Sequence, residues 1–534
     1  MHNLIVYFTV LLLFINGCSN QDSAKSDFNI VLITVDTLRA DHLSCYGYVR
    51  KTSPNIDTIA ENGIVFKNVI APSSWTAPSI VSLFTSVYPI NHGVVSGAGY
   101  GWNPRKQEIF SEKLTTLTEI LKSCGYTTFG VASNLHLKRK FGFARGFDYF
   151  ECLSFSAAFH VNKAVFKWED KIKSSNKYFL WVHYIDPHFP YSPRTPWIKQ
   201  YISSTSAHAL DIDKKHYSQL RELIPQLIND KQALSNLVAR YDSEINYVDV
   251  YLGALIKKLD LDNNTLIIIT SDHGEEFLEH GDLGHGGYLY QESINIPLIV
   301  KLPFNYKKEI NEGQVNLIDI MPSILRMLNI TPTEQIAGKS FWRRDDLLFW
   351  LKKALSGNDP PNYNYAETGG EVGLKTVITP QWKYIYNYKL QTDQLYNIRS
   401  DSLELNNLVD AEPKQRDQLK EKLFTWVIRS KKYPPKKETH TLSKEDREKF
   451  EALGYAAVKE TEGDEDSDGI PDEKDNCPKE PNGPNKGICT GGYIGEVCVS
   501  NAECGDDGFC SMNQEDMDRD GIGDVCKSAV FVAH

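Results

Sequence analysis

Long apolar runs are scarce in this sequence of 534 residues, and their scarcity limits what the chain can be. After residues 4–15 no second long apolar run follows, which excludes a polytopic membrane protein. Glycine shows no collagen-like period, so a triple helix is excluded as well. The hydrophobic fraction of 41% is enough for a packed core. The length predicts one large enzyme domain with an appendage, or several domains.

An excess of positive charge is also lacking. The net charge of −11 argues against a nucleic-acid partner. That charge is unevenly distributed, because residues 460–526 contain 19 Asp and Glu against 4 Lys and Arg, a balance of −15. The remainder of the chain therefore carries +4, and the acidic C-terminal segment is expected to be a separate domain.

Cysteine is rare until the same C-terminal segment. Six of the ten cysteines lie within residues 477–526, and an even, dense cluster predicts a disulfide framework formed in an oxidising compartment. The pairing among these six stays open. Cys45, Cys124 and Cys152 are scattered, and we expect them to be buried small hydrophobic residues.

The N-terminal apolar run predicts export. Residues 4–15 are too short for a membrane span and have the length of a signal-peptide core. The following Asn16-Gly17-Cys18 resembles a bacterial lipobox, in which the cysteine becomes the lipidated N-terminus, although no Lys or Arg precedes the run and Asn16 is unusual there. A plain signal peptide or signal anchor is the alternative.

We predict a lipoprotein-type signal peptide over residues 1–17 and a tether over residues 18–27. The lipid anchor on Cys18 would hold an exported protein at a bacterial membrane, in the periplasm or at the cell surface.

Two apolar runs predict neighbouring parallel strands. Residues 29–35 read as a buried strand that ends at Asp36, and residues 266–270 read as a second that ends before Asp272 and His273. Apolar residues at helical spacing over 245–259 predict a helix packed on the sheet. Alternating strands and helices indicate an α/β fold with a mostly parallel sheet.

The polar residues that follow these strands are candidate metal ligands. Ligands of α/β proteins bind at the carboxyl ends of the strands. Asp36, Asp272 and His273 all fall at such ends, and carboxylates and imidazoles suit Ca²⁺, Mg²⁺, Mn²⁺ or Zn²⁺. An adjacent Asp-His pair can also serve merely to cap a helix.

A third segment predicts the start of an amphipathic helix. Pro78 and Ser79 suit a first turn, and apolar spacing begins at Ile80. Thr76 then lies at or just before the helix N-terminus, where free N–H groups and the helix dipole favour an alkoxide and an incoming anion. The alternative is an ordinary N-cap threonine.

Together these segments resemble the sulfatase family of the alkaline phosphatase superfamily, over roughly residues 28–457. The matching motifs occur in the family's order at residues 35–41 (VDTLRAD), 53–57 (SPNID), 76–79 (TAPS), 125–126 (GY), 186–191 (DPHFPY), 271–275 (SDHGE), 279–281 (EHG), 319–322 (DIMP), 393–397 (DQLYN) and 453–455 (LGY). The resemblance implies a large sandwich around a mostly parallel sheet, with a smaller C-terminal antiparallel sheet of four strands.

The chain departs from the family at the residues that hold sulfate. Family members carry Cys or Ser, converted to formylglycine, where this chain has Thr76, and threonine cannot be oxidised to that aldehyde. No formylglycine is therefore expected. The family's Arg is Ile80, its two Lys are Asn134 and His285, and so three permanent cations are missing. Thr37 replaces a further metal-binding Asp.

These departures make the reaction site resemble a distant branch of the superfamily. A Thr nucleophile beside one metal is similar to lipoteichoic acid synthases and phosphoethanolamine transferases, which cleave phosphodiesters through a phosphothreonine. The resemblance implies one divalent cation (Ca²⁺, Mg²⁺ or Mn²⁺) held by Asp36, Thr76, Asp272 and His273.

Three histidines complete the expected reaction site. His188, His136 and His285 would contact the sulfuryl or phosphoryl oxygens or protonate the leaving group. Each can instead be a polar residue satisfied inside the fold, and His280 is interpreted as structural because a glycine follows it.

The acidic tail predicts bound calcium. Carboxylates alternate before a glycine in two places, so that they can converge on one cation; they are Asp464, Asp466, Asp468, Asp472, Asp475, Asp516, Asp518, Asp520 and Asp524. The pattern resembles thrombospondin type 3 repeats over residues 464–527, interrupted by a cysteine-rich insert and preceded by a linker at 458–463. A solvated acidic linker is the alternative.

The whole sequence predicts an exported, metal-assisted sulfuric ester hydrolase with Thr76 as nucleophile. Its substrate would be a sulfated or phosphorylated ester of glycan or lipid type. One alternative is a phosphodiesterase, or a transferase of phosphoethanolamine or glycerophosphate. Another is an inactive, calcium-dependent surface binding protein.

Overall fold

The computed structural model describes most of the first 452 residues and three short strands beyond them. The described residues are 28–95, 106–192, 194–202, 221–261, 264–331, 336–342, 363–368, 373–431, 438–452, 487–489, 497–498 and 510–511. The chain divides into two compact units, residues 1–456 and 457–534, and each is described by itself. The signal peptide and tether predicted over residues 1–27, the linker and the tail carboxylates lie outside the described residues.

An eight-stranded sheet forms the centre of the first unit. Within this sheet only β10 runs against its neighbours, so the predicted α/β fold with a mostly parallel sheet is confirmed. In sheet order the strands are β11 (Glu309–Asn316), β2 (Ile64–Ile70), β10 (Leu298–Lys301), β7 (Thr265–Ser271), β1 (Asn29–Val35), β6 (Tyr178–Tyr184), β4 (Thr127–Ser133) and β5 (Tyr149–Leu153).

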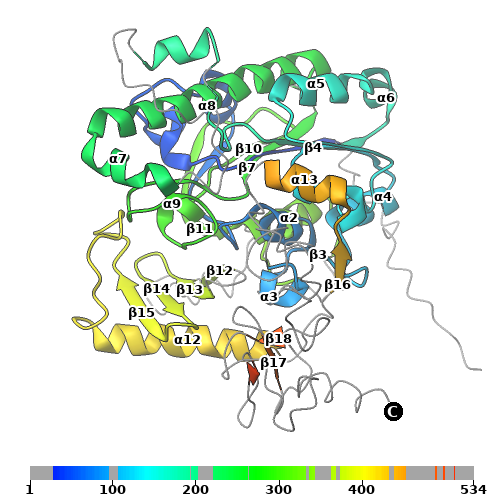
Figure 1. Cartoon of the computed structure of the whole chain (residues 1–534). Coiled ribbons are helices and arrows are strands. Elements are labelled where there is room, and N and C mark those ends of the chain that lie inside the picture. The colour runs from blue at the N-terminus through cyan, green and yellow to red at the C-terminus, as the bar shows by residue number, and fades with distance from the viewer. Residues whose placement is uncertain are drawn as a thin grey trace, which may run out of the picture. The chain divides into compact units, whose positions relative to one another are not determined.

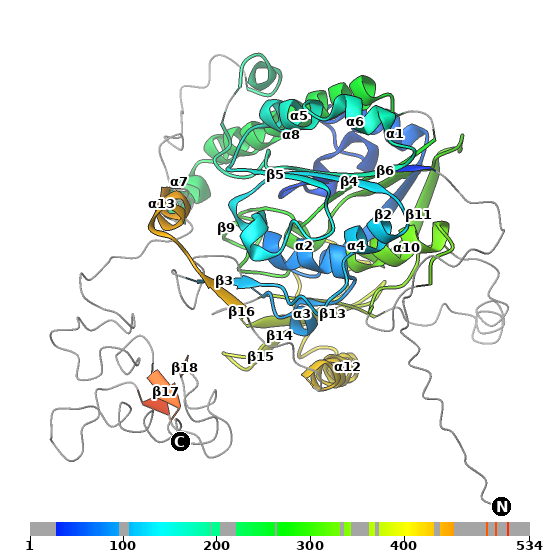
Figure 2. The same cartoon turned by 90° about the vertical axis from the view of Figure 1, so that its right-hand side faces the viewer.

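Helices cover both faces of this sheet (Figure 2). One face carries α1 (Pro54–Glu61), α5 (Ala158–Phe166), α6 (Glu169–Ser174) and α8 (Lys231–Leu259), and the other carries α2 (Thr76–Thr85), α4 (Leu117–Ser123) and α10 (Ile320–Met327). Strand β1 feeds both cores, because Ile30 and Leu32 point to one face while Val31 and Ile33 point to the other. This double burial explains the continuous apolar run of β1.

The helix that precedes β7 is longer than its apolar spacing predicted. Helix α8 runs over Lys231–Leu259 rather than beginning near residue 245. The Asp230 side chain starts it by accepting hydrogen bonds from the backbone N–H groups of Gln232 and Ala233. Short helix α7 (Ile224–Asn229) packs before it.

A second, smaller sheet follows in the chain (Figure 1). Strands β12 (Asn364–Glu367), β13 (Leu374–Ile378), β14 (Lys383–Asn387) and β15 (Thr392–Tyr396) form an antiparallel meander, which confirms the predicted four-stranded sheet. Helix α12 (Pro413–Lys431) buries Leu419 and Leu423 against Val377, Tyr384 and Leu395 of this sheet. The apolar contacts give the small sheet a core of its own.

The remaining described elements are short. They are α3 (Pro89–His92), α9 (Gln291–Ile294), α13 (Lys444–Ala452), the ribbon of β3 (Lys106–Ile109) with β16 (Glu438–Thr441), and the hairpin of β8 (Glu276–Phe277) with β9 (Leu283–Gly284). In the second unit β17 (Gly487–Cys489) pairs with β18 (Val497–Cys498) and β19 (Cys510–Ser511). Among the described helices, none has both the length and the apolar character needed to cross a membrane.

The scattered cysteines differ from the expectation. Cys45 and Cys152 are free, but Cys124 is disulfide-bonded. Cys45 and Cys152 pack against the apolar cores but are half-buried rather than buried, and the prediction of a small hydrophobic role is wrong for Cys124. Sequence spacing could not reveal this, because a disulfide depends on which cysteine comes close in space.

A fully buried ion pair joins the small sheet to the chain around α9. Lys383 Nζ on β14 lies 2.9 and 3.0 Å from the two carboxylate oxygens of Glu404, and both residues are almost completely buried. Glu404 also accepts a hydrogen bond from the backbone N–H of Gln291, where α9 begins. Burial lowers the pKa of Lys383 and raises the pKa of Glu404. Each charge therefore depends on the other to remain ionised.

We predict that Lys383→Met destabilises the protein by about 3–5 kcal/mol, because it leaves a buried carboxylate unpaired. The loss of unfolding free energy should grow as the pH rises above the ordinary pKa of glutamate, because an unpaired Glu404 is costly to bury only when it is ionised. Urea unfolding at several pH values measures it. The control Lys420→Met removes a partly exposed partner of Asp393 and should cost no more than about 1 kcal/mol. Equal effects of the two substitutions would contradict the prediction.

Candidate active site

The ends of strands β1 and β7 place two carboxylates side by side. The strands pair in parallel with Val35 opposite Ser271, so the residues that follow them, Asp36 and Asp272, become neighbours. One ligand atom from each of Asp36, Asp272 and His273 lies within 4.8 Å of the others. All three side chains are completely buried. Residues more than two hundred positions apart in sequence thus form one compact donor set.

Two oxygens of this donor set have no hydrogen-bond partner among the described residues. They are Asp36 Oδ1 and Asp272 Oδ2, and His273 Nε2 lies 3.6 and 3.5 Å from them. His273 Nδ1 is 2.9 Å from the carbonyl oxygen of Gly274, which can only accept. Nδ1 therefore carries the hydrogen, and the Nε2 lone pair faces the carboxylates.

This arrangement fits a divalent cation. Two buried carboxylates facing each other repel unless a positive charge lies between them. Burial, together with the charge of Asp36, raises the pKa of Asp272. Two carboxylate oxygens and one imidazole nitrogen are donors that Ca²⁺, Mg²⁺ or Mn²⁺ accepts, with Thr76 Oγ1 beside them.

The second oxygen of Asp36 is held by two residues whose roles the sequence did not reveal. Asn134 Nδ2 donates to Asp36 Oδ2 at 2.8 Å, and His183 Nε2 lies 3.3 Å from the same oxygen. Thr34 Oγ1 orients His183 from the other side, 2.8 Å from its Nδ1. Burial alone would raise the pKa of Asp36, but the hydrogen bond to His183 lowers it overall. The available signal was a histidine near the end of the buried run 178–184.

Thr76 presents its hydroxyl to this donor set from the first position of α2. Trp75, not Thr76, is the N-cap residue, so Thr76 is not an ordinary N-cap threonine. Its Oγ1 lies 3.3 Å from His273 Nε2 and 3.5 Å from Asp36 Oδ2. The start of α2 thus brings together a hydroxyl, the positive end of a helix dipole and the buried carboxylates.

Thr37 adopts a backbone conformation that is unusual for its type. Its φ is 55°, in the left-handed region that a β-branched residue rarely occupies. The turn directs its backbone N–H to Asp272 Oδ1 at 3.3 Å, while Tyr241 Oη donates to its carbonyl oxygen at 2.7 Å. Strain of this kind costs about 1–3 kcal/mol and persists where surrounding contacts impose it. Thr37 therefore supports Asp272 through its backbone.

The predicted histidines gather around the same donor set. The ring centroid of His285 is 4.4 Å from that of His273 and 5.0 Å from that of His188. His285 Nδ1 lies 2.9 Å from Glu275 Oε1, and His188 Nδ1 lies 2.6 Å from the carbonyl oxygen of Phe189. His136 packs with Trp75 at a ring distance of 6.0 Å, and its backbone N–H donates to Asn134 Oδ1.

Burial keeps these histidines uncharged. It lowers the pKa of His188 to about 4 and that of His136 to about 3, and it also lowers the pKa of His285. The site therefore presents neutral imidazoles and lacks the permanent cations that other family members are expected to have there. A neutral imidazole becomes a cation when an anion binds beside it, because the anion favours the charged form.

A glycine allows the loop of His285 to pass close to Trp75. Gly286 has a φ of 85°, and a Cβ added to it would lie 2.4 Å from Trp75 Cε3. Any other residue would displace either the indole or the loop. The indole ring in turn lies 5.2 Å from the ring of His285.

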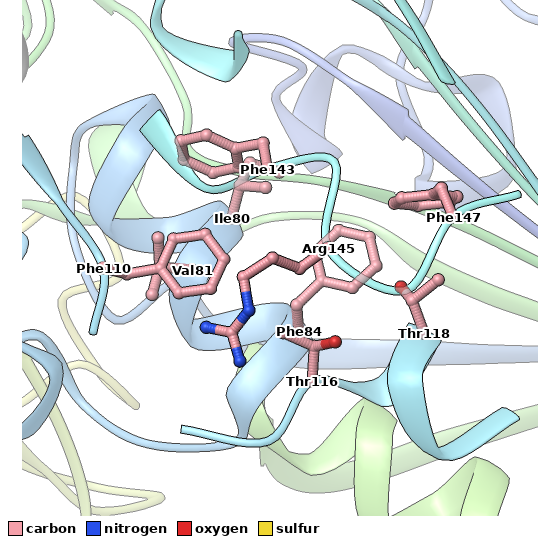
Figure 3. A pocket seen from close by; sticks show the side chains of 9 residues that line it. All are labelled: Ile80, Val81, Phe84, Phe110, Thr116, Thr118, Phe143, Arg145 and Phe147. Atoms are coloured by element: carbon pink, nitrogen blue, oxygen red, sulfur yellow. The ribbon is translucent and has the colours of Figure 1, made fainter. Parts of the chain in front are cut away.

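Ile80 lies in the core and not in the reaction site. It is completely buried and lines a cavity of about 10 Å³ with Val81, Phe84, Phe143 and Phe147 (Figure 3). The position at which the resemblance expects an arginine thus belongs to the packing of α2 against its neighbours. The cationic side chain is replaced by apolar contacts.

His280 has no place in the donor set. Its Nδ1 lies 2.6 Å from Glu292 Oε1, and its Nε2 lies 3.2 Å from the carbonyl oxygen of Glu404. Its ring stacks on Tyr290 at 3.6 Å. Although Glu276, His280 and Glu292 form a second group of possible metal ligands, both ring nitrogens are already engaged. The interpretation of His280 as structural remains.

Comparison with known proteins identifies the family. The sequence model of the sulfatase family matches residues 28–330, more than half of the chain, and the chain belongs to that family. A model described as N-sulphoglucosamine sulphohydrolase, C-terminal, matches residues 279–431. A thrombospondin type 3 repeat matches residues 461–484. The resemblance found in the motifs is thereby confirmed, and the family's members support a hydrolase acting on sulfate esters.

Individual relatives are distant but cover most of the first unit. The uncharacterized sulfatase YidJ of Escherichia coli (strain K12) is 22% identical over 430 residues, which span 72% of this chain and 83% of that protein. A protein solved in complex with its substrate D-glucosamine-2-N,6-O-disulfate aligns with a TM-score of 0.60 at 18% identity, covering 77% of this chain and all of that one. The phosphonate monoester hydrolase of Agrobacterium radiobacter aligns with a TM-score of 0.59 at 19% identity, covering 76% and 96%. These structures share the alkaline phosphatase-like sulfatase fold.

We predict that Asp272→Asn abolishes binding of one Mn²⁺ per chain, because it removes one of the two unpartnered buried oxygens. The substitution also removes the repulsion with Asp36, so without added metal the variant should unfold at a higher temperature than the unsubstituted protein. Metal analysis and thermal unfolding with and without Mn²⁺ measure both effects. The control Asp148→Asn alters a partly exposed partner of Lys122 and should leave metal content unchanged. Full Mn²⁺ occupancy in Asp272→Asn would exclude this donor set.

Proposed function

We propose that this protein is an exported hydrolase that cleaves sulfuric esters at Thr76, assisted by one divalent cation. The observation that carries the proposal is the position of Thr76 Oγ1, 3.3 Å from His273 Nε2 and 3.5 Å from Asp36 Oδ2, beside two unpartnered carboxylate oxygens. This hydroxyl lies next to the proposed metal ligands and at the N-terminus of α2.

Asp36, Asp272, His273 and Thr76 would hold the cation. The chemistry that a bound divalent cation supplies is a lower pKa for the threonine hydroxyl and neutralisation of charge on the ester. Asn134 orients both partners, since its Nδ2 lies 2.8 Å from Asp36 Oδ2 and 3.5 Å from Thr76 Oγ1. His183, on the neighbouring strand β6, holds Asp36 in place from the other side.

The reaction proceeds in two displacements. A neutral buried imidazole takes the proton of the Thr76 hydroxyl as Oγ1 attacks the sulfur; an O–S bond forms, and the bond from sulfur to the alcohol oxygen breaks. The departing alkoxide takes a proton from a second histidine, which is in its imidazolium form. Water then gives a proton to this histidine and attacks the sulfur of the sulfothreonine; the bond from Oγ1 to sulfur breaks, sulfate leaves, and Thr76 Oγ1 takes a proton back from a protonated histidine.

The neutral histidines bind the ester and supply that proton. The negative charge of the bound ester raises the pKa of His188, His136 and His285 from their low values, so protons are taken up as the substrate enters. An imidazolium formed there donates hydrogen bonds to the nonbridging oxygens and then protonates the leaving group. Protonation on binding replaces the permanent cations that this site lacks.

One observation favours a phosphoric ester as the second candidate substrate. Thr76 has a single oxygen on its β-carbon, so it cannot expel sulfate by collapsing to an aldehyde. Its covalent intermediate must be opened by water at sulfur or phosphorus. A phosphodiesterase, or a transferase of phosphoethanolamine or glycerophosphate, fits this constraint, and one structural neighbour is a phosphonate monoester hydrolase.

An inactive surface binding protein is a weaker alternative. The proposed donor set, nucleophile and histidines are all present and lie together, whereas a site that has lost its function would be free to lose any of them. The Asp36 and Asp272 oxygens in particular are costly to keep buried without partners.

The substrate class and location complete the proposal. One structural neighbour was solved with a disulfated glucosamine as its substrate, which supports a sulfated glycan here. A signal over residues 1–17 and a lipid on Cys18 would place the enzyme at a bacterial membrane, in the periplasm or at the cell surface. Calcium bound by the thrombospondin type 3-like tail would order that tail.

We predict that Thr76→Ala abolishes turnover while leaving folding and Mn²⁺ binding largely intact, because it removes one hydroxyl and leaves Asp36, Asp272 and His273 to hold the cation. Thr76→Ser is the matched control, since it keeps the hydroxyl and should retain measurable activity. Turnover is measured with Mg²⁺ or Mn²⁺ on an aryl sulfate, a phosphate monoester and a phosphodiester in parallel. The preferred substrate decides between the two candidate functions, and full activity in Thr76→Ala would refute covalent catalysis at this residue.

We predict that removing Ca²⁺ makes residues 464–526 sensitive to proteases, because 19 acidic residues against 4 basic ones within 460–526 repel one another without cations. The first unit has its own cores and should stay folded. A chain ending shortly after Tyr455 should accordingly hydrolyse a small soluble ester. A soluble, metal-loaded truncation without activity would show that the tail belongs to the reaction site. Limited proteolysis and activity assays measure these outcomes.

A further inference from the structure

A cleft of about 660 Å³ opens beside the loop that carries His285. Gly287, Tyr288 and Tyr290 line one side, and Leu374 and Gln394 of the small sheet line the other. The volume falls within the range of small-molecule sites. We call this space the Tyr288 cleft. Its walls come from the segment between β9 and α9 and from the small sheet, whereas the donor set lies at the ends of β1 and β7 and the start of α2.

The Tyr288 cleft is near the candidate reaction site along the chain. His285, whose ring lies 4.4 Å from that of His273, precedes Gly287 by two residues. Two virtual bonds between Cα atoms span at most about 8 Å. The backbone of Gly287, which lines the Tyr288 cleft, is therefore within about 8 Å of the backbone of His285.

Positive charge predominates in the cleft. Its charged lining residues are Arg221, Lys389 and Asp282. Arg221 Nε donates to Asp282 Oδ1 at 2.7 Å, and its Nη2 lies 3.4 Å from the position that a Cβ on Gly287 would take. The ion pair thus holds the guanidinium over the loop, with the side chain 45% exposed.

Lys389 contributes an exposed charge from the opposite wall. It lies in the turn between β14 and β15, and within the described residues no carboxylate forms an ion pair with it. Arg221 lies over Gly287, two residues after His285, so its charge is close to the segment that leads into the candidate reaction site.

The other lining residues suit a sugar. Tyr288 is 37% exposed, and its ring stacks at 5.8 Å on Tyr290. The hydroxyl of Tyr290 is fixed by Gln394, whose amide atoms lie 3.1 and 3.2 Å away. An exposed aromatic face with polar groups around it can pack against a saccharide ring and bind its hydroxyls.

We propose that the Tyr288 cleft binds the part of a sulfated glycan beyond the scissile ester, and that Arg221 and Lys389 select substrates with a second anionic group there. This inference rests on the proposed function, because it deepens the substrate class of the same site. Arg221 and Lys389 are specificity-determining residues and take no part in bond breaking. The two cations supply at the cleft the permanent positive charge that is missing around Thr76.

The test compares D-glucosamine-2-N,6-O-disulfate with D-glucosamine-6-O-sulfate as substrates of the full chain. The unsubstituted protein should show the higher kcat/KM for the disulfate. In Arg221→Gln and in Lys389→Gln the ratio of the two kcat/KM values should fall about tenfold, the effect of one charge-assisted hydrogen bond. The change should appear mainly in KM. The control Lys308→Gln removes an exposed charge outside the cleft and should keep the ratio.

Binding is measured in parallel by calorimetry on Thr76→Ala, so that the cleft is tested even without turnover. Failure of the unsubstituted protein to hydrolyse any sulfate ester overturns the proposed function, whereas tighter binding of the disulfate would still support the cleft. Equal binding of the two sugars overturns the inference. So does an unchanged ratio in both variants, or an equal loss on both sugars. Arg221→Gln breaks the ion pair with Asp282 and could lower the ratio by rearranging the loop. Lys389→Gln leaves that pair intact, so a lower ratio in Lys389→Gln as well cannot be explained by such a rearrangement.

Discussion

The reaction site depends on two carboxylates that the sheet forces together. Asp36 and Asp272 follow paired parallel strands, and in the described part of the chain each keeps one buried oxygen without a hydrogen-bond partner. Neighbouring residues are arranged to tolerate this repulsion: Asn134 and His183 bind the far oxygen of Asp36, while the strained backbone of Thr37 donates to Asp272. A divalent cation bound between the two carboxylates would offset the cost of holding like charges in the core.

The surroundings of Thr76 follow from that constraint. Because α2 begins next to the carboxylates, its first hydroxyl and its free N–H groups face the same point. Burial keeps His188, His136 and His285 neutral, so under the proposed function these histidines would take up protons as an anionic ester binds. Ile80 shows why no arginine shares this task, since its position is turned into the apolar core. Affinity for the charged substrate is then expected to come from outside, where Arg221 and Lys389 line the Tyr288 cleft.

Contacts between the small sheet and the segment around α9 hold the two walls of the Tyr288 cleft together. Lys383 and Glu404 form a buried pair, and Glu404 also holds the first residue of α9. The segment that leads from His285 to α9 therefore has a fixed partner on the small sheet. Tyr290, which stacks on His280 and bonds Gln394, adds a second link. The wall that would recognise the glycan is thus positioned relative to the residues that would cleave it.

Much of this organisation was legible in the sequence. The apolar runs at 29–35 and 266–270 identified the strands, because strands buried on both faces contain few polar residues, and their ends identified Asp36, Asp272 and His273. The ordered motifs identified the family, and periodicity marked the start of α2 and hence Thr76. Contacts between distant segments were decided by the tertiary structure alone. The sequence could not show that His183 contacts Asp36, that α8 begins at Lys231, that Cys124 is disulfide-bonded, or that Arg221 lies over Gly287. Local patterns report on burial and turn chemistry, whereas these features depend on which distant segments the packed sheet and helices bring within a few ångströms of one another.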